Sequence, residues 1–170
     1  MFYIAGSSNG RTRDSESRYL GSSPSPAANT FGIIYAMKTD PRLHHYCQNI
    51  VKGNLDDVVE MYKLLGFDVV YTPPQGSAWV MVGQKQLRFA IQVSEVADTP
   101  IADVDIKKRT HVAFLSDNPQ QVINEVRTWA ESKNIKFREG GWSPIERFFD
   151  LKDIFVNFVV EVMHTSIEEN

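Results

Sequence analysis

The sequence predicts an α+β protein built from two copies of one βαβββ module. Two amphipathic helical patterns each follow one strand-like segment and precede three more. The chain has 170 residues, of which 42% are hydrophobic and 23% charged, a composition typical of a globular protein with one modest core. Neither copy alone could cover a sheet on both faces, so we expect the two modules to pack together.

The N-terminal segment, residues 1–36, differs from the rest of the chain. Gly6–Ala28 is rich in Ser, Gly, Arg and Pro, so it cannot bury enough apolar surface to offset the entropy of ordering, and we expect it to be flexible. Two interpretations stay open. The segment is an ordinary tail, or it is not native coding sequence, because Gly21–Pro24 can be back-translated into a tRNA-like T-loop. The native start would then be Met37, and residues 37–170 the folded domain.

The first module is expected over residues 43–97. A strand is predicted at Leu43–Val51, and Asn54 is a plausible N-cap for the helix that follows. Apolar side chains recur in that helix at helical spacing, at Leu55, Val58, Val59, Tyr62 and Leu65, and Gly66 provides a stop. Three further strands are predicted, at Phe67–Tyr71, Ala78–Val82 and Leu87–Val93.

The second module repeats this order over residues 108–164, after a linker at Lys107–Arg109. A strand is predicted at His111–Ser116, followed by a helix that Asp117 or Ser116 caps, that has Pro119 in its first turn and that Asn134 ends. Strands are then expected at Ile135–Arg138, Ile145–Phe149 and Ile154–Met163, with a turn at Gly140–Pro144 between the first two.

Charge and cysteine content exclude several classes of function. The formal net charge is −3, so the chain is poorly suited to neutralising phosphates, and we expect no nucleic-acid partner. The single cysteine, Cys47, cannot form an internal disulfide, which favours a reducing compartment. No apolar run reaches the roughly 20 residues that a bilayer requires. We therefore expect a cytoplasmic protein without membrane contact.

Strand alternation places several polar side chains on one face of the predicted sheets, opposite the apolar residues that should pack on the helices. His45 and His111 stand at corresponding places in the first strand of each module. Gln92 and Glu161 lie on the polar faces of two later strands. A solvent-exposed polar face is common in antiparallel sheets, but the occurrence of such residues at corresponding places in two copies favours a functional site.

The motif NLDDVVEMYKLLGF resembles the first helix of the vicinal oxygen chelate superfamily, which includes glyoxalase I, extradiol dioxygenases, fosfomycin-resistance transferases and bleomycin-binding proteins. HVAFLSDNP is similar to the opening of that family's second module, and the resemblance extends over Leu43–His164. It implies paired modules that form a cupped mixed sheet with the helices outside and the site within the cup.

The resemblance also implies a set of metal ligands from the first and fourth strand of each module: His45, Gln92, His111 and Glu161. Such a set would hold a divalent metal (Zn, Ni, Fe or Mn) with an open position for two vicinal substrate oxygens, and Glu161 could instead act as a general base. Two alternatives stay open: Cys47 in place of His45, and Glu95 in place of Gln92.

Two functions follow from this resemblance. The first is a metal-dependent lyase, isomerase or dioxygenase that acts on a substrate with vicinal oxygens. The second is a metal-free protein of the bleomycin-binding type that sequesters a drug in an apolar cleft. Candidate residues that line or anchor a small molecule are Trp79, Trp142, Tyr71, Phe149, Phe155, Arg88, Asn157 and Gln92. We expect a small-molecule ligand and a homodimer, with the cup formed within one chain or across two.

Overall fold

The computed structural model describes residues 43–85, 87 and 89–169, all of which belong to one compact unit, Arg42–Asn170. The predictions for residues 1–36, including a native start at Met37, lie outside the described residues, as does Arg88. Within the described part of the chain, no helix is long and apolar enough to cross a membrane.

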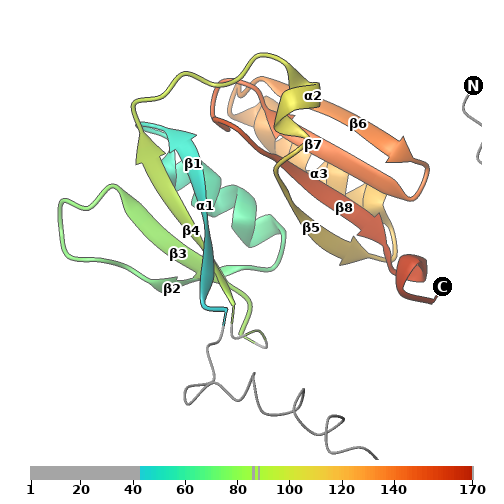
Figure 1. Cartoon of the computed structure of the whole chain (residues 1–170), viewed down its shortest axis with the longest axis horizontal. Coiled ribbons are helices and arrows are strands. Elements are labelled where there is room, and N and C mark those ends of the chain that lie inside the picture. Colours follow the sequence, from blue (N-terminus) through green and yellow to red (C-terminus); the bar gives the residue numbers. More distant parts are fainter. Residues whose placement is uncertain (1–42, 86, 88, 170) are drawn as a thin grey trace, which may run out of the picture. The chain divides into compact units, whose positions relative to one another are not determined.

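The first module has the predicted βαβββ order (Figure 1). Its elements are β1 (His45–Val51), α1 (Leu55–Leu64), β2 (Asp68–Tyr71), β3 (Trp79–Gly83) and β4 (Ala90–Val96). The strands form sheet A in the order β1-β4-β3-β2, in which β1 runs parallel to β4 and the other neighbours are antiparallel. This parallel pairing puts the first and last strands of the module side by side.

The second module repeats this arrangement after a short linker helix, α2 (Val104–Lys107). Its elements are β5 (His111–Ser116), α3 (Pro119–Ser132), β6 (Phe137–Ser143), β7 (Glu146–Leu151) and β8 (Val159–His164), followed by a 3-10 helix, η2 (Thr165–Glu169). Sheet B has the order β5-β8-β7-β6, with β5 parallel to β8. The predicted α+β class and paired modules are confirmed.

Several predicted strand limits are wrong. The fourth strand of the first module is Ala90–Val96 rather than Leu87–Val93. The last strand begins at Val159 rather than Ile154, because the preceding residues bond to the first module: Val51 N donates to Ile154 O at 2.9 Å, and Val156 N donates to Asn49 O at 3.1 Å. The predicted turn at Gly140–Pro144 is mostly strand, since β6 continues to Ser143. Gly140 is required there for space, because a Cβ would lie 2.6 Å from the Phe148 ring.

The helix ends also differ in detail from the prediction. Asn118 rather than Asp117 or Ser116 caps α3, and its side-chain oxygen accepts from Gln121 N at 3.1 Å. Asn54 occupies the N-cap of α1 without a side-chain bond. Glu95 serves that helix end instead, because its carboxylate accepts from Gly53 N at 2.7 Å and Leu55 N at 3.1 Å.

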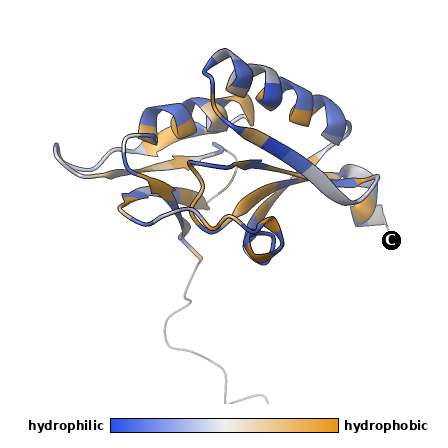
Figure 2. Cartoon of the chain, turned by 90° about the horizontal axis from the view of Figure 1, so that it is seen from above, coloured by the Kyte–Doolittle hydropathy of each residue, from blue (hydrophilic) through white to orange (hydrophobic). Residues whose placement is uncertain are grey.

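Both long helices lie on the same side of the two sheets, as the view along the sheets shows (Figure 2). Phe114 of β5 packs on the first module, with ring centroids 5.3 Å from Phe67 and 6.5 Å from Tyr62. At the surface, Lys133 after α3 bonds to Glu60 of α1 at 2.6 Å. The two modules therefore share one hydrophobic core beneath the helices.

The linker helix α2 lies on the other side and anchors itself with a buried lysine. Lys107 Nζ donates to Asp150 Oδ1 at 2.9 Å and to Phe155 O at 2.6 Å. Arg138 reaches the second oxygen of Asp150 at 2.5 Å. Burial lowers the pKa of Lys107, and the Asp150 carboxylate opposes that shift. The pair holds the linker against sheet B.

We expect Lys107→Met to lower the free energy of unfolding by about 3 kcal/mol, because removing one partner of a buried ion pair leaves the other charge poorly compensated. Urea unfolding followed by circular dichroism measures this change. Lys136→Met is the matched control: Lys136 pairs with Asp153 at 2.7 Å, but both side chains are at least 60% exposed. Its loss should stay below about 1 kcal/mol. Equal losses in the two variants would contradict a structural role for the buried pair.

Candidate functional site

Because both helices cover one side of the sheets, the opposite faces of the strands are open. In sheet A the strand registers place Cys47 opposite Gln92, and Gln92 opposite Met81. His45 lies two residues before Cys47 on β1, so its side chain is on the same open face as Gln92. In sheet B, Ala113 lies opposite Glu161. His111 lies two residues before Ala113, so His111 and Glu161 are diagonal neighbours on one face, as His45 and Gln92 are in sheet A.

An apolar cleft of about 600 Å³ lies on the open face of sheet A. A register shift between Val69 and Tyr71 puts Val70 out of the β2–β3 ladder, and both Val70 and Tyr71 line the cleft. Tyr71 stacks on Trp79 with ring centroids 5.6 Å apart and planes 22° from parallel. The lining residues are His44, Val70, Tyr71, Trp79, Met81, Gly83, Gln84, Leu87, Phe89 and Ala90. Among the described residues of this lining there is no Asp, Glu, Lys or Arg, and these side chains suit an uncharged, flat group.

The open face of sheet B carries an imidazole and a carboxylate in contact. His111 Nε2 lies 3.4 Å from Glu161 Oε2. His111 Nδ1 lies 3.0 Å from the Lys108 carbonyl oxygen, which can only accept, so Nδ1 carries the hydrogen. This bond fixes the tautomer and directs Nε2 toward Glu161, an orientation common in histidines that bind metals or transfer protons.

Glu161 is buried although its carboxyl group lies on the open face. Burial raises the pKa of Glu161, His111 opposes that shift, and the nearby Glu146 carboxylate adds to it. The raised pKa means that the folded carboxyl group of Glu161 holds its proton to higher pH than a carboxyl group in water does, beside an imidazole that can exchange protons with it.

Trp142 forms an aromatic wall beside this pair. It lies at a second register shift, between Gly141 and Ser143 on the edge strand β6. Its ring centroid is 5.8 Å from the His111 ring and 5.1 Å from that of Phe148. The two modules therefore carry a register shift at corresponding places in their edge strands, β2 and β6. The residue within each shift is Val70 in the first module and Trp142 in the second.

The four predicted metal ligands are not gathered into one cluster. His45 and His111 line one groove of about 550 Å³ between the modules, but His45 Nδ1 bonds with His44 Nδ1 at 2.9 Å. Gln92 Nε2 donates to Ser94 Oγ at 2.9 Å. Among the described residues, no three His, Cys, Asp or Glu side chains lie close enough to share a metal ion. Of the four predicted ligands, His111 and Glu161 are the pair that the structure brings into contact.

The two alternatives for the first module have different outcomes. Glu95 is committed to the N-terminus of α1 and does not replace Gln92. Cys47 is exposed, and its Sγ lies 3.5 Å from Ser94 Oγ on the open face. Cys47 and His45 therefore share one face, and both stay possible donors.

The remaining predicted ligand-binding residues are dispersed. Trp79 lies in the cleft of sheet A and Trp142 on sheet B, whereas Asn157 is exposed in the connection before β8. Phe149 and Phe155 are fully buried in the core, so their predicted place in a cleft is wrong. Phe149 faces the core because β7 alternates about Phe148, which takes the open face. Phe155 lies in the connection between β7 and β8, with its ring 6.2 Å from that of Phe149.

Sequence reasoning missed several residues of the open faces: His44, Leu87 and Phe89 in the first module, and Lys108 and Phe148 in the second. Phe148 could have been found from the alternation of β7. Lys108 could not, because its position depends on how the linker folds back.

No protein-family model and no curated protein matches the sequence. Solved structures match at low identity. The fosfomycin resistance protein FosX from Listeria monocytogenes, in complex with Mn(II) and 1S,2S-dihydroxypropylphosphonic acid, is 12% identical with a TM-score of 0.51, over 77% of this chain and 98% of that one. A lactoylglutathione lyase from Agrobacterium tumefaciens is 17% identical with a TM-score of 0.45, over 76% and 97%.

A glyoxalase family protein from Bacillus anthracis is 14% identical with a TM-score of 0.45, over 75% of this chain and 98% of that one. At these identities the likeness concerns the fold alone. The match to FosX shows that the chain shares the fold of that structure and spans nearly its whole length.

The raised pKa of Glu161 predicts a pH-dependent contribution to stability. The unfolded carboxyl group loses its proton near pH 4.3, while the folded one keeps it to higher pH, so stability falls as pH rises through that window. The glutamine in Glu161→Gln cannot ionise, so this variant should lack that pH-dependent loss of stability. We therefore expect the difference in Tm, variant minus parent, to increase from pH 4 to neutrality when both are measured with a chelator present. A difference that does not change with pH would contradict the raised pKa.

Proposed function

We propose that this chain, which has the paired βαβββ fold of glyoxalase-like and fosfomycin-resistance proteins, is a small-molecule-binding protein of the vicinal oxygen chelate superfamily. The observation that carries the proposal is the apolar cleft of about 600 Å³ on the open face of sheet A. Its size lies in the range of about 300–1,000 Å³ that is usual for sites that bind small ligands.

The character of the cleft indicates what it binds. Tyr71 is 49% exposed although it stacks on Trp79, so part of this aromatic platform is open to a third ring. Leu87 is 54% exposed at the rim. Large apolar side chains kept on a concave surface favour a flat organic ligand of low charge.

Binding of the neutral probe N-phenyl-1-naphthylamine tests this proposal. We expect the probe to fluoresce on binding to the parent protein, and Trp79→Ala to weaken its affinity about tenfold through loss of stacking and buried area. Ile106→Ala is the matched control, since Ile106 is a large apolar side chain that is 43% exposed on α2, away from the cleft. Equal binding by the parent and Trp79→Ala would reject the cleft as the site.

A second function is supported by the contact between His111 and Glu161. An imidazole whose Nδ1 is held by a carbonyl oxygen and whose Nε2 faces a carboxylate is half of a site for Zn, Ni, Fe or Mn. We propose that a metal-dependent lyase, isomerase or dioxygenase site forms when a second copy of the chain brings His45 and Gln92 to this pair. The symmetric exposure of both open faces supports a homodimer built in this way.

An exposed apolar side chain on sheet B supports the same arrangement. Leu115 of β5 is 42% exposed on the open side of sheet B and belongs to neither proposed ligand site. A large apolar side chain in this position favours burial against a second copy.

Mixing two variants tests where the metal site forms. His45→Ala and His111→Ala should each lose the metal that mass spectrometry detects in the parent dimer purified without chelator. If the site is shared between copies, unfolding and refolding the two variants together restores one intact site in each mixed dimer. Recovery of metal in the mixture supports the shared site. A parent protein without metal, or a mixture without recovery, would reject it while leaving the apolar cleft untouched.

A further inference from the structure

We infer that Trp142 and Phe148 on the open face of sheet B form a subsite for an organic ammonium group, and that the ammonium of Lys108 takes this position in the free chain. The inference rests on the proposed small-molecule function and names a class of ligand for the second module. It concerns a different surface from the apolar cleft of sheet A.

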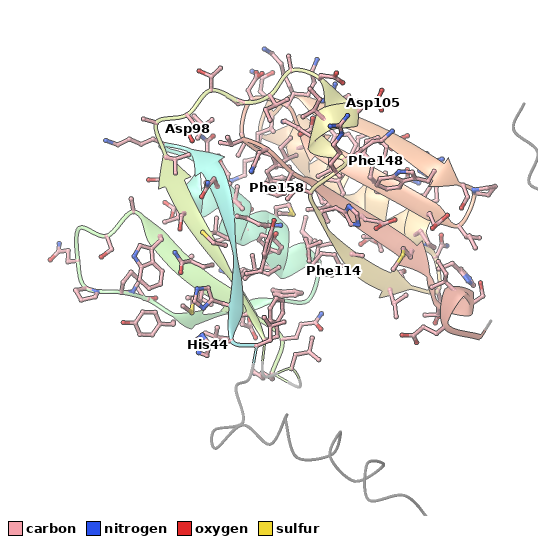
Figure 3. All side chains as sticks on the ribbon, in the orientation of Figure 1. His44, Asp98, Asp105, Phe114, Phe148 and Phe158 are labelled. Carbon is pink, nitrogen blue, oxygen red and sulfur yellow. The ribbon has the colours of Figure 1, made fainter. Side chains whose placement is uncertain are left out.

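The position of Lys108 carries the argument. Its Nζ lies 5.6 Å from the centroid of the Trp142 ring and 5.5 Å from that of Phe148. Both distances fall within the range of about 6 Å over which the negative face of an aromatic ring attracts a cation. The two rings meet nearly edge to face, at 62°, so they present two walls to one cation. Figure 3 shows Phe148 and Asp105 on the same side of sheet B, beside α2.

The charges around the rings also favour a cation. Lys107 and Arg138 are paired with Asp150, and Lys108 is paired with Asp105 at 2.7 Å. By contrast, the described residues offer no lysine or arginine within 4 Å of Glu161 or Glu146. Among the described residues, the basic side chain in contact with Glu161 is that of His111, and the ammonium beside the two rings is that of Lys108. When Lys108 leaves the rings, a ligand cation would replace its positive charge.

The side chain of Lys108 can be exchanged for a ligand. Its partner Asp105 is 76% exposed, and an ion pair in contact with water contributes little to stability. The backbone of Lys108 is anchored independently, because its carbonyl oxygen accepts from His111. The side chain can therefore leave the rings without disturbing the linker.

An ammonium ligand is preferred over a metal ion at this subsite because aromatic faces offer no lone pairs to a metal. A quaternary ammonium ion separates the two possibilities, since it stays charged at every pH and cannot be coordinated. Its neutral carbon isostere has the same shape, which isolates the contribution of the charge.

Choline and its neutral isostere 3,3-dimethylbutan-1-ol are therefore the probes, with binding followed by the proton NMR signal of their methyl groups. We expect choline to bind the full chain with an upfield shift, as protons over an aromatic face experience, and the isostere to bind about tenfold more weakly. Lys108→Ala should strengthen choline binding several-fold by vacating the rings. Trp142→Leu should weaken it about tenfold, and circular dichroism should show an intact fold, since Trp142 is 43% exposed.

Equal affinity for choline and the isostere would overturn the inference, as would an unchanged or weaker affinity in Lys108→Ala. Choline binding to Glu161→Gln provides a second measurement. Weaker binding by this variant supports attraction of the cation by the Glu161 carboxylate, and unchanged binding rejects it. Binding of N-phenyl-1-naphthylamine without choline binding would refute this subsite alone. Failure of the naphthylamine together with choline binding would refute the apolar cleft instead.

Discussion

The constraint on which the rest of the structure depends is the packing of both amphipathic helices on one side of the two sheets. Phe114 of β5 lies against Phe67 and Tyr62 of the first module, so the helices and the inner strand faces make one core rather than two. In the part of the chain that the structure describes, neither sheet has a second layer of long helices on its other face. The open faces, where His111, Glu161 and the aromatic cleft lie, are a direct consequence of that shared core.

The two open faces differ in chemistry because the linker covers only one of them. On sheet B, α2 inserts Lys107 against Asp150, and the neighbouring Lys108 extends over Trp142. Charged groups are therefore concentrated on the second module. On sheet A no helix of residues 43–169 intervenes, and Tyr71 and Trp79 lie in a cleft whose described lining holds no Asp, Glu, Lys or Arg. One fold thus offers a neutral surface and an acidic one to different parts of a ligand, or to different ligands.

Local patterns in the sequence were sufficient for the module order and for α1, whose apolar spacing and Gly66 stop match the structure. Alternation also placed Glu161 and His111 on one face. It could not place Phe155, because the last strand begins later than its apolar run suggests. It could not reveal that Glu95 caps a helix 40 residues earlier in the chain. Those features depend on contacts between segments, such as the bonds from β1 to Ile154, that no single window contains.

The irregular edge strands have a further consequence. β2 and β6 are the outermost strands of their sheets, and each carries one residue, Val70 or Trp142, that has no partner in the ladder. Replacing such a residue breaks no pairing between strands. A side chain as small as that of Val70 and one as large as that of Trp142 can therefore occupy this position with little effect on folding. Duplicated copies of one module could in this way have diverged in what they recognise while keeping a common architecture.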